Sequence, residues 1–484
     1  MSARFRHKLR LLPLIAFLYA SLSGGPFGQE AMLPSSGPGM VLLLLVVAAF
    51  LWGVPMMLTA AELGSAMPVE GGYYRWTRRA LGDFWGFQSG WWIWFSSLLD
   101  QAIYPVLMVS YLEKFLLPGI SDQVITVGFL QFRWLHWLLC MTVIIPCTAI
   151  NIRGVKAVGL TSIVLDVLII VPYLIFVIVA FSQWQFNPFT PLVPPGKSVP
   201  EALGFGLLFA MWNYSGFQLP STASEEIDNP TVALPKASFI ALPLIMLGYI
   251  LPLMAALAVR SDWMTWEDGT FVHIAREIGE IVPHGGAVLA ALVTLGTVAG
   301  CVSLFNGLLV PYTRIQFAMA EDRFQPGWLT RLHPRYETPW KSILFNVAIY
   351  SILIMFDFQE LLTVDIWLLL PPYCLVFLSL AVLRWREPRL RRPFRIRGGA
   401  LGLSLVILPP ILLAGAAAWS SVRQVLEANN YFVLWVGVGS IASGPAAYLA
   451  AWSWHRLHGT RPLPALRAED ASEPAGADAP QPPA

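Results

Sequence analysis

The first apolar segment of the chain contains a stretch that cannot remain helical. Residues 11–32 are apolar enough to enter a bilayer, yet Gly24, Gly25 and Pro26 stand in their midst. Glycine costs about 1 kcal/mol and proline about 3 kcal/mol of helix propensity, and hydrocarbon offers no water to an open backbone. Such an interruption persists only where protein surrounds it or where it lines a wet cavity. We therefore expect residues 23–28 to form half of a substrate site.

The composition predicts a protein that crosses a membrane many times. Of its 484 residues, 56% are hydrophobic and 12% are charged, whereas soluble domains contain about 25% charged residues. The net charge of +2 gives no reason to expect a nucleic-acid partner. The four cysteines have no metal-ligand spacing, and no phosphate-binding GxxxxGK[ST] motif is present. We expect no metal, no cofactor and no use of ATP, and no nucleophile–base pair suggests an enzyme.

We predict an all-α polytopic fold with about twelve transmembrane helices, each close to the length of about 20 residues that a bilayer requires. The predicted spans are residues 11–33, 40–63, 84–117, 134–150, 158–181, 200–223, 235–259, 286–319, 341–356, 360–383, 401–422 and 431–453. The predicted domains are a cytoplasmic N-terminus (1–10), a transport core (11–383), a basic loop (384–400), two C-terminal helices (401–453) and a disordered tail (454–484).

The distribution of Lys and Arg predicts the orientation of the spans. With the N-terminus in the cytoplasm, the inward segments hold most basic residues, and the densest run occupies residues 384–397. The outward loop 261–280 is acidic. We therefore expect a multi-pass protein of the cell membrane with both termini in the cytoplasm. For the run 384–397 we favour a role as topology determinant over attraction of anionic lipid.

The sixth predicted span repeats the anomaly of the first. Asn213, Ser215, Gly216 and Pro220 cluster where a spanning helix should be most apolar. This span follows the first by five, so residues 11–181 and 200–383 would form two repeats of opposite orientation. Paired interrupted helices in two inverted halves are the best sequence indication of a transporter site. Each break would present free N–H groups to anions and free carbonyls to cations.

Several motifs resemble those of the amino acid–polyamine–organocation transporters, in particular the polyamine and L-type branch. The similar stretches are residues 23–30, 71–74, 80–91, 100–107 and 212–230, within a resemblance covering about residues 10–395. The resemblance implies a five-plus-five inverted-repeat fold with two additional C-terminal helices. It also implies alternating access around a central site.

The resemblance also suggests roles for individual residues. Backbone N–H groups of the first break would bind a substrate carboxylate, and the second break would face the ammonium group and side chain. The first set is Ser23, Gly24, Gly25 and Gly28, the second is Asn213, Tyr214, Ser215 and Gly216, and further substrate-binding candidates are Asp100, Tyr104 and Gln218.

The substrate class depends on the acids near the site. Polyamine-transporting members of this branch have an aspartate where Gln218 stands, and a polyamine needs acidic partners for its ammonium groups. Asp100 and Glu30 remain. We favour an amino acid as substrate, with a polyamine as the alternative and amino acid exchange as another mode.

Acidic residues within spans are functional candidates, because a charge near the bilayer centre costs about 3 kcal/mol. Asp100, Asp166 and Glu30 are the predicted proton-coupling residues, and Asp365 is a further buried acid. For Glu30 and Asp365 a hydrogen-bonding role is an equal alternative. The resemblance implies that several sodium-independent relatives carry a lysine in the fifth span. This chain has no central lysine there, and Ile169 stands near the expected position. We therefore place proton coupling before sodium coupling and exchange.

Glu225 and Glu226 close the sixth span on the predicted cytoplasmic side. They are candidate gating residues, although capping of the helix end explains them equally well. A channel would share the spans and breaks but would not need inverted halves. No obligatory protein partner is expected, so the predicted partners are a small amino acid or related amine and the lipid bilayer.

Overall fold

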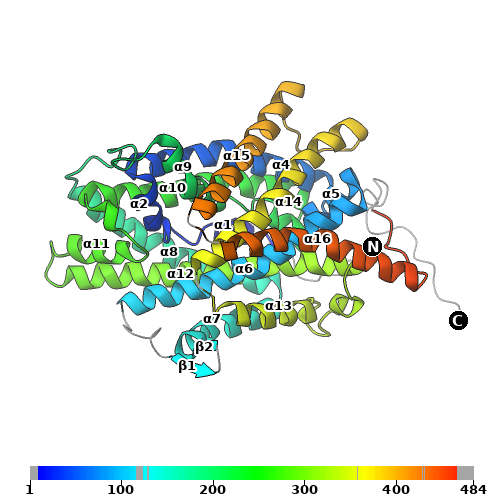
Figure 1. The fold of residues 1–484 in the computed structure, drawn as a ribbon, viewed down its shortest axis with the longest axis horizontal. Coiled ribbons are helices and arrows are strands. Elements are labelled where there is room, and N and C mark those ends of the chain that lie inside the picture. Colours follow the sequence, from blue (N-terminus) through cyan, green and yellow to red (C-terminus); the bar gives the residue numbers. More distant parts are fainter. Residues whose placement is uncertain are drawn as a thin grey trace.

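The computed structural model describes residues 9–115, 124–127, 130–356, 358–427, 429 and 431–465. These residues are almost entirely helical (Figure 1). The prediction of an all-α fold missed one hairpin, in which β1 (Val124–Val127) pairs with β2 (Leu130–Arg133) in antiparallel register. Its strands are rich in β-branched and aromatic residues, which favour extended backbone.

The first half of the chain contains an interrupted helix followed by longer ones. The elements are α1 (Leu11–Leu22), η1 (Gln29–Met32), α2 (Leu33–Ser36), α3 (Pro38–Ala48), η2 (Ala49–Gly53), α4 (Val54–Ala66), α5 (Gly72–Leu81), α6 (Asp83–Phe115), α7 (Trp134–Arg153) and α8 (Val155–Ser182).

The second half also contains an interrupted helix followed by longer ones, and two further helices follow at its end. It comprises α9 (Val199–Asn213), η3 (Leu219–Glu226), α10 (Pro230–Val259), η4 (Trp263–Thr265), α11 (Thr270–Gly279), α12 (Gly285–Glu321), η5 (Gly327–Thr330), α13 (Trp340–Leu353), α14 (Phe358–Arg386), α15 (Gly399–Glu427) and α16 (Tyr431–Leu457).

Each predicted span has a helical counterpart, with ends shifted by a few residues. Within the described residues, nine helices are long and apolar enough to cross a membrane. The other three predicted spans correspond to α1 with its following break, α9 with its following break, and the shorter α13. The chain is therefore a multi-pass membrane protein.

Both predicted interruptions are present. Helix α1 ends at Leu22, and the chain then passes through Gly25 and Gly28 at φ values of 103° and 79°. Helix α9 ends at Asn213, and Gly216 follows at φ 116°. Only glycine adopts such left-handed backbone without steric cost. The glycines thus permit the chain to leave the helix at both places.

Helices α6 and α12 form the centre of the bundle and pack against each other (Figure 1). Helix α12 also contacts α1, α8, α11 and η3, so it touches elements next to both breaks. By contrast, α15 and α16 are the least buried of the candidate spans. Only 28% and 22% of the residues in their most apolar stretches are buried inside the structure. The two C-terminal helices therefore lie at the periphery of the molecule.

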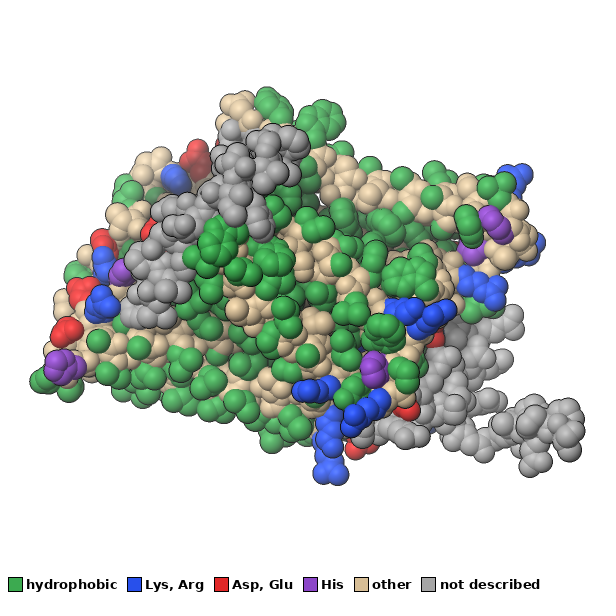
Figure 2. Space-filling view, turned by 90° about the horizontal axis from the view of Figure 1, so that it is seen from below, with side chains coloured by type: hydrophobic (Ala, Val, Ile, Leu, Met, Phe, Trp, Pro, Cys, Tyr) green, Lys and Arg blue, Asp and Glu red, His purple; other side chains and the backbone are tan. Residues whose placement is uncertain are grey.

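The outer surface of the helices is apolar, as a lipid-facing surface must be. Val164 and Ile178 on α8 are 60% and 61% exposed, and Leu401 and Leu412 on α15 are both 72% exposed. Figure 2 shows hydrophobic side chains across the middle of one face, with blue Lys and Arg gathered toward one edge. A large continuous apolar surface is unusual on a soluble monomer.

The C-terminal end differs from the predicted boundary. Helix α16 continues to Leu457, beyond the predicted limit at 453. The His455 ring lies 2.7 Å from the Arg323 carbonyl oxygen, and the backbone N–H of Leu463 donates to Asp322 at 3.3 Å. The predicted disordered tail thus begins too early, and its residues 466–484 lie outside the described part of the chain.

The packing of α12 against the first break leads to a prediction. A Cβ on Gly300 would overlap the carbonyl oxygen of Gly24, whereas a Cβ on Gly296 would lie 3.4 Å from its nearest neighbours. Overpacking costs about 1–3 kcal/mol. We expect Gly300→Ala to lower the thermal midpoint of the detergent-solubilised protein by several degrees, roughly as that energy implies. Gly296→Ala, on the same helix, should leave the midpoint nearly unchanged. Equal midpoints for both variants would contradict this account of the packing.

Candidate functional site

The two breaks border a common cavity in the middle of the bundle. Its volume is about 40 Å³, which is room for only a few water molecules. It is lined by Ser21, Leu22, Gly24, Gly25, Phe27, Asp100, Tyr104, Trp212, Asn213, Ser215, Leu219, Tyr249, Leu304, Leu308, Tyr312, Leu369 and Tyr373. These residues come from α1 and its break, α6, α9 and its break, α10, α12 and α14. A larger solute requires these helices to move.

Asp100 is the one charged residue among the described residues that line the cavity. The hydroxyl of Tyr104 donates to its Oδ1 at 2.7 Å, and the hydroxyl of Tyr312 donates to its Oδ2 at 2.8 Å. The side chain is 2% exposed. Two neutral donors hold the carboxylate in place without neutralising it. Because a buried charge is costly without a counter-charge, the arrangement suits a cationic ligand.

Aromatic rings surround the carboxylate. The ring of Trp212 stacks nearly parallel to that of Tyr104, with centroids 6.2 Å apart. The rings of Trp212 and Phe209 meet edge to face, with centroids 5.5 Å apart. Tyr249 and Tyr373 complete the aromatic lining. The face of an aromatic ring attracts a cation within about 6 Å. These rings and Asp100 therefore favour the same charge on a ligand.

The first break also provides unpaired backbone groups. Within the described residues, the N–H groups of Gly24 and Gly25 make no hydrogen bond. Their neighbours are held: the N–H of Ser23 donates to Tyr19 at 2.7 Å, and the Tyr249 hydroxyl donates to the Leu22 carbonyl at 2.8 Å. The two glycines can thus donate to an anionic or carbonyl oxygen of a ligand.

The predicted substrate-binding residues divide into two groups. Gly24, Gly25, Asp100, Tyr104, Asn213 and Ser215 line the cavity. Ser23, Gly28, Tyr214, Gly216 and Gln218 belong to the breaks but do not line it. Tyr214 packs on Tyr249 at 5.6 Å instead, and Gln218 is fully buried outside the lining.

Sequence reasoning missed most of the aromatic lining. Trp212, Tyr249, Tyr312 and Tyr373 come from four different helices and meet only in the folded chain. The sequence did contain an indication of these residues, because the three tyrosines are polar positions within otherwise apolar spans. A phenol in such a position usually needs a hydrogen-bond partner.

A second buried acid lies near Asp100. Asp365 on α14 is fully buried, accepts a short hydrogen bond from Ser96, and is an electrostatic neighbour of Asp100. Its Oδ2 atom has no hydrogen-bond partner in the described part of the chain. The described cavity lining thus contains one carboxylate and no cation, and Asp365 is a second carboxylate close enough to Asp100 to interact with it.

Glu30 connects the first break with two other elements. Its Oε1 accepts hydrogen bonds from the Tyr111 hydroxyl at 2.9 Å and from the backbone N–H of Gly269 at 3.3 Å. The Tyr111 oxygen in turn accepts the N–H of Gly28 at 3.1 Å. Glu30 therefore ties the segment after the break to α6 and to the start of α11.

Asp166 on α8 is 7% exposed, and its Oδ1 has no hydrogen-bond partner within the described residues. It is an electrostatic neighbour of Tyr19 on α1. Ile169, on the same helix, contacts the first break, since a Cβ on Gly25 would lie 3.1 Å from its Cγ2 atom. Helix α8 therefore carries a buried acid that interacts electrostatically with Tyr19 of α1, and its Ile169 borders the first break.

A buried ion cluster connects the second break with α12. The Arg314 Nε lies 2.8 Å from Glu226 Oε1 and 3.9 Å from Glu70 Oε1. All three side chains are at most 3% exposed. Burial, reinforced by the charge of Glu226, raises the pKa of Glu70 well above its usual range. Glu225, the other predicted gating residue, has no ion pair within the described residues and is half-buried. Arg314 and Glu70 were not predicted.

Two short helices, one in each half, begin at a left-handed glycine and contact the break of the other half. Gly71 precedes α5, and its N–H donates to the carbonyl of Thr222, after the second break, at 2.9 Å. Gly269 precedes α11, and its N–H donates to Glu30, after the first break. The segment following each break is thus fastened to the opposite half.

Comparisons with known proteins identify the family of the chain. The family model for amino acid permeases matches residues 11–449. The polyamine transporter RMV1 of Arabidopsis thaliana is 31% identical over 438 residues, covering 90% of this chain and 84% of the relative. The branched-chain amino acid permease BcaP of Bacillus subtilis (strain 168) is 24% identical over 422 residues, covering 84% and 85%.

A rice relative, the polyamine transporter PUT1 of Oryza sativa subsp. japonica, is 31% identical over 437 residues, covering 90% of this chain and 76% of the relative. The family and these relatives are transporters, not enzymes. The chain belongs to the amino acid permease family, within the amino acid–polyamine–organocation superfamily.

Proposed function

We propose that this chain is a secondary transporter of a small organic amine, and that Asp100 binds the ammonium group of the substrate. The observation that carries the proposal is the lone carboxylate in an aromatic cavity between two interrupted helices. A second carboxylate nearby, Asp365, suits a substrate with a second ammonium group. A polyamine such as putrescine has this chemistry.

This preference differs from the amino acid favoured by the sequence. That argument rested on Gln218, which does not line the cavity, whereas Asp100 does. Relatives named as polyamine transporters also have higher identity than the named amino acid permease, at 31% against 24%. An amino acid is the second candidate, because the free N–H groups of Gly24 and Gly25 could bind its carboxylate.

Alternating access between two inverted repeats is the mechanism we infer. The order of elements supports it: each half has an interrupted helix, then a long helix, a ten-residue helix and further long helices. Interrupted helices in corresponding positions of two halves are typical of such transporters. Movement of the segments after the breaks would open the cavity to one side at a time. The Lys and Arg distribution supports a cytoplasmic location for both termini.

Proton coupling is proposed through Asp166. Its Oδ1 has no hydrogen-bond partner within the described residues and its charge acts on Tyr19, so a change in its protonation state would alter the electrostatic interaction between α8 and α1. Glu30 also has an oxygen, Oε2, without a hydrogen-bond partner within the described residues, but two donors already bind its Oε1 and hold the side chain in place. Protonation of a buried acid removes a charge that hydrocarbon and protein disfavour.

The proposed role of Asp100 can be tested by transport. We expect Asp100→Asn to lower the apparent affinity for putrescine by roughly tenfold or more, since a charge-assisted hydrogen bond contributes about 1.5–3 kcal/mol. The measurement is uptake of radiolabelled putrescine, arginine and leucine into proteoliposomes. Glu427→Gln, at the exposed end of α15 and outside the cavity lining, is the control and should change affinity little. Saturable leucine uptake without putrescine uptake by the unmodified protein would contradict the amine proposal.

The coupling proposal predicts a different phenotype. In the unmodified protein, uptake should increase as the external pH falls. Asp166→Asn should make uptake independent of pH, because the group that binds the proton is gone. Glu30→Gln should reduce the rate but retain the pH dependence. If Asp166→Asn keeps the full pH dependence of proteoliposome uptake, Asp166 is not the proton carrier.

The ion cluster around Arg314 is proposed as a gate that holds the end of the second break against α12. Removing one partner of a buried ion pair costs about 3–5 kcal/mol. Arg314→Gln should therefore lower the thermal midpoint strongly, and adding Glu226→Gln should restore part of the loss. Glu225→Gln is the control and should have little effect. A double variant whose loss equals the sum of the single losses would show that the pair is not coupled.

A further inference from the structure

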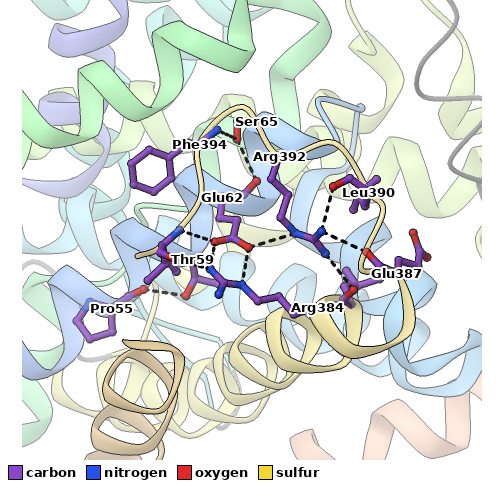
Figure 3. A network of polar contacts seen from close by, with 11 residues as sticks. Pro55, Thr59, Glu62, Ser65, Arg384, Glu387, Leu390, Arg392 and Phe394 are labelled. Carbon is purple, nitrogen blue, oxygen red and sulfur yellow. Dashed lines mark hydrogen bonds and ion pairs between the residues drawn. The ribbon is translucent and has the colours of Figure 1, made fainter. Parts of the chain in front are cut away.

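The connection between α14 and α15 is an ordered loop built on one buried carboxylate (Figure 3). Glu62 of α4 accepts hydrogen bonds from Arg384 Nε and from the backbone N–H of Ile396, each at 2.8 Å. Arg392 Nε lies 3.2 Å from the same carboxylate. The Ser65 hydroxyl accepts the N–H of Phe394 at 3.2 Å. These contacts fix residues 392–396 against α4.

Other arginines of this basic segment are bound by the protein itself. Arg392 also donates to the carbonyls of Leu383 and Leu390, each at 3.0 Å. Arg386 donates to the Ala80 carbonyl at 3.0 Å. Burial lowers the pKa of Arg392, and the charges of Arg384 and Arg395 add to this effect, although Glu62 opposes it. Several positive charges therefore lie close together in the loop between α14 and α15.

Four further arginines, Arg389, Arg391, Arg395 and Arg397, are exposed and have no ion pair within the described residues. Two of them, Arg395 and Arg397, line an open cavity of about 550 Å³ together with Arg384 and the start of α15. Arg389 and Arg391 belong to the same loop but do not line it. The cavity thus combines a rigid floor with uncompensated positive charge.

The cavity also lies at the edge of the membrane. The loop connects two apolar spans, Val364–Arg386 and Gly399–Glu427. An exposed apolar row begins in the first turn of α15 and continues along the helix at Leu401, Leu405, Leu408 and Leu412, which are 72%, 62%, 56% and 72% exposed. Trp385, at the end of α14, is 80% exposed, and tryptophan is common at membrane–water interfaces.

We propose that this cavity binds an anionic phospholipid, whose phosphate pairs with Arg395 and Arg397 while an acyl chain follows the leucine row of α15. Guanidinium groups bind phosphate oxygens in a bidentate manner. Basic pockets between spanning helices are suited to anionic headgroups. The segment therefore has a ligand of its own in addition to any role in orienting the chain. The proposal is independent of the transported substrate.

Native mass spectrometry of the full chain in detergent tests the proposal. Dioctanoyl phosphatidylglycerol is titrated, with dioctanoyl phosphatidylcholine and inorganic phosphate as separate arms. We expect Arg395→Gln/Arg397→Gln to weaken binding of phosphatidylglycerol by roughly tenfold or more, since each basic residue contributes a several-fold factor near an anionic lipid. The matched control is Arg389→Gln/Arg391→Gln, which removes the same charge from the same loop and should change binding by less than about twofold.

The outcomes separate the alternatives. Equal weakening in both double variants would indicate diffuse attraction and would overturn the site. Equal binding of phosphatidylcholine, or displacement of the lipid by inorganic phosphate at equal concentration, would overturn the lipid. The four side chains are exposed, so the variants should elute normally from a sizing column. Arg395→Lys/Arg397→Lys, which keeps the charge, should retain more affinity than the glutamine variant, and failure to do so would also contradict the proposal.

Discussion

The need to satisfy backbone polar groups inside a membrane governs the structure of this protein. Opening a helix exposes N–H and carbonyl groups that lipid cannot satisfy. Here the first break is enclosed by other helices: Tyr249 of α10 binds the carbonyl of Leu22, Tyr111 of α6 binds Gly28, and Gly300 lets α12 approach Gly24. The N–H groups of Gly24 and Gly25 stay unpaired at the cavity. The surrounding helices thus satisfy part of the opened backbone, and the N–H groups of Gly24 and Gly25 remain available to a ligand.

The buried charges follow a similar division. Glu62 is compensated by Arg384 and Arg392, and Arg314 is compensated by Glu226. Such pairs can hold elements together without needing anything from outside the chain. Asp100 has no described basic partner, since two neutral phenols donate to its carboxylate, and it differs from the other uncompensated acids in lining the cavity. An acid that the fold orients without a described counter-charge supports the proposal of a cationic substrate.

The sequence allowed the spans and both breaks to be predicted, because hydropathy, glycine and proline act locally. It also identified Asp100, an acid in the middle of an apolar span. It could not identify Tyr249, Tyr312 and Tyr373 as neighbours, because their meeting depends on the packing of separate helices. The direction of side chains within a break was equally inaccessible: Tyr214 and Gln218 adjoin Asn213 and Ser215 but do not line the cavity. In irregular backbone, helical periodicity no longer indicates which residues share a face.

The hydrogen bonds made by Gly71 and Gly269 suggest how opening of the cavity on one side could exclude its opening on the other. Gly71 holds the segment after the second break through Thr222, and Gly269 holds the segment after the first break through Glu30. Each of these bonds joins one half of the chain to the other. A movement of one half relative to the other must therefore strain both hydrogen bonds, unless the two bonds break at different stages. In the proposed alternating-access mechanism, a bond that yields on one side while its counterpart persists would keep the cavity closed at one end.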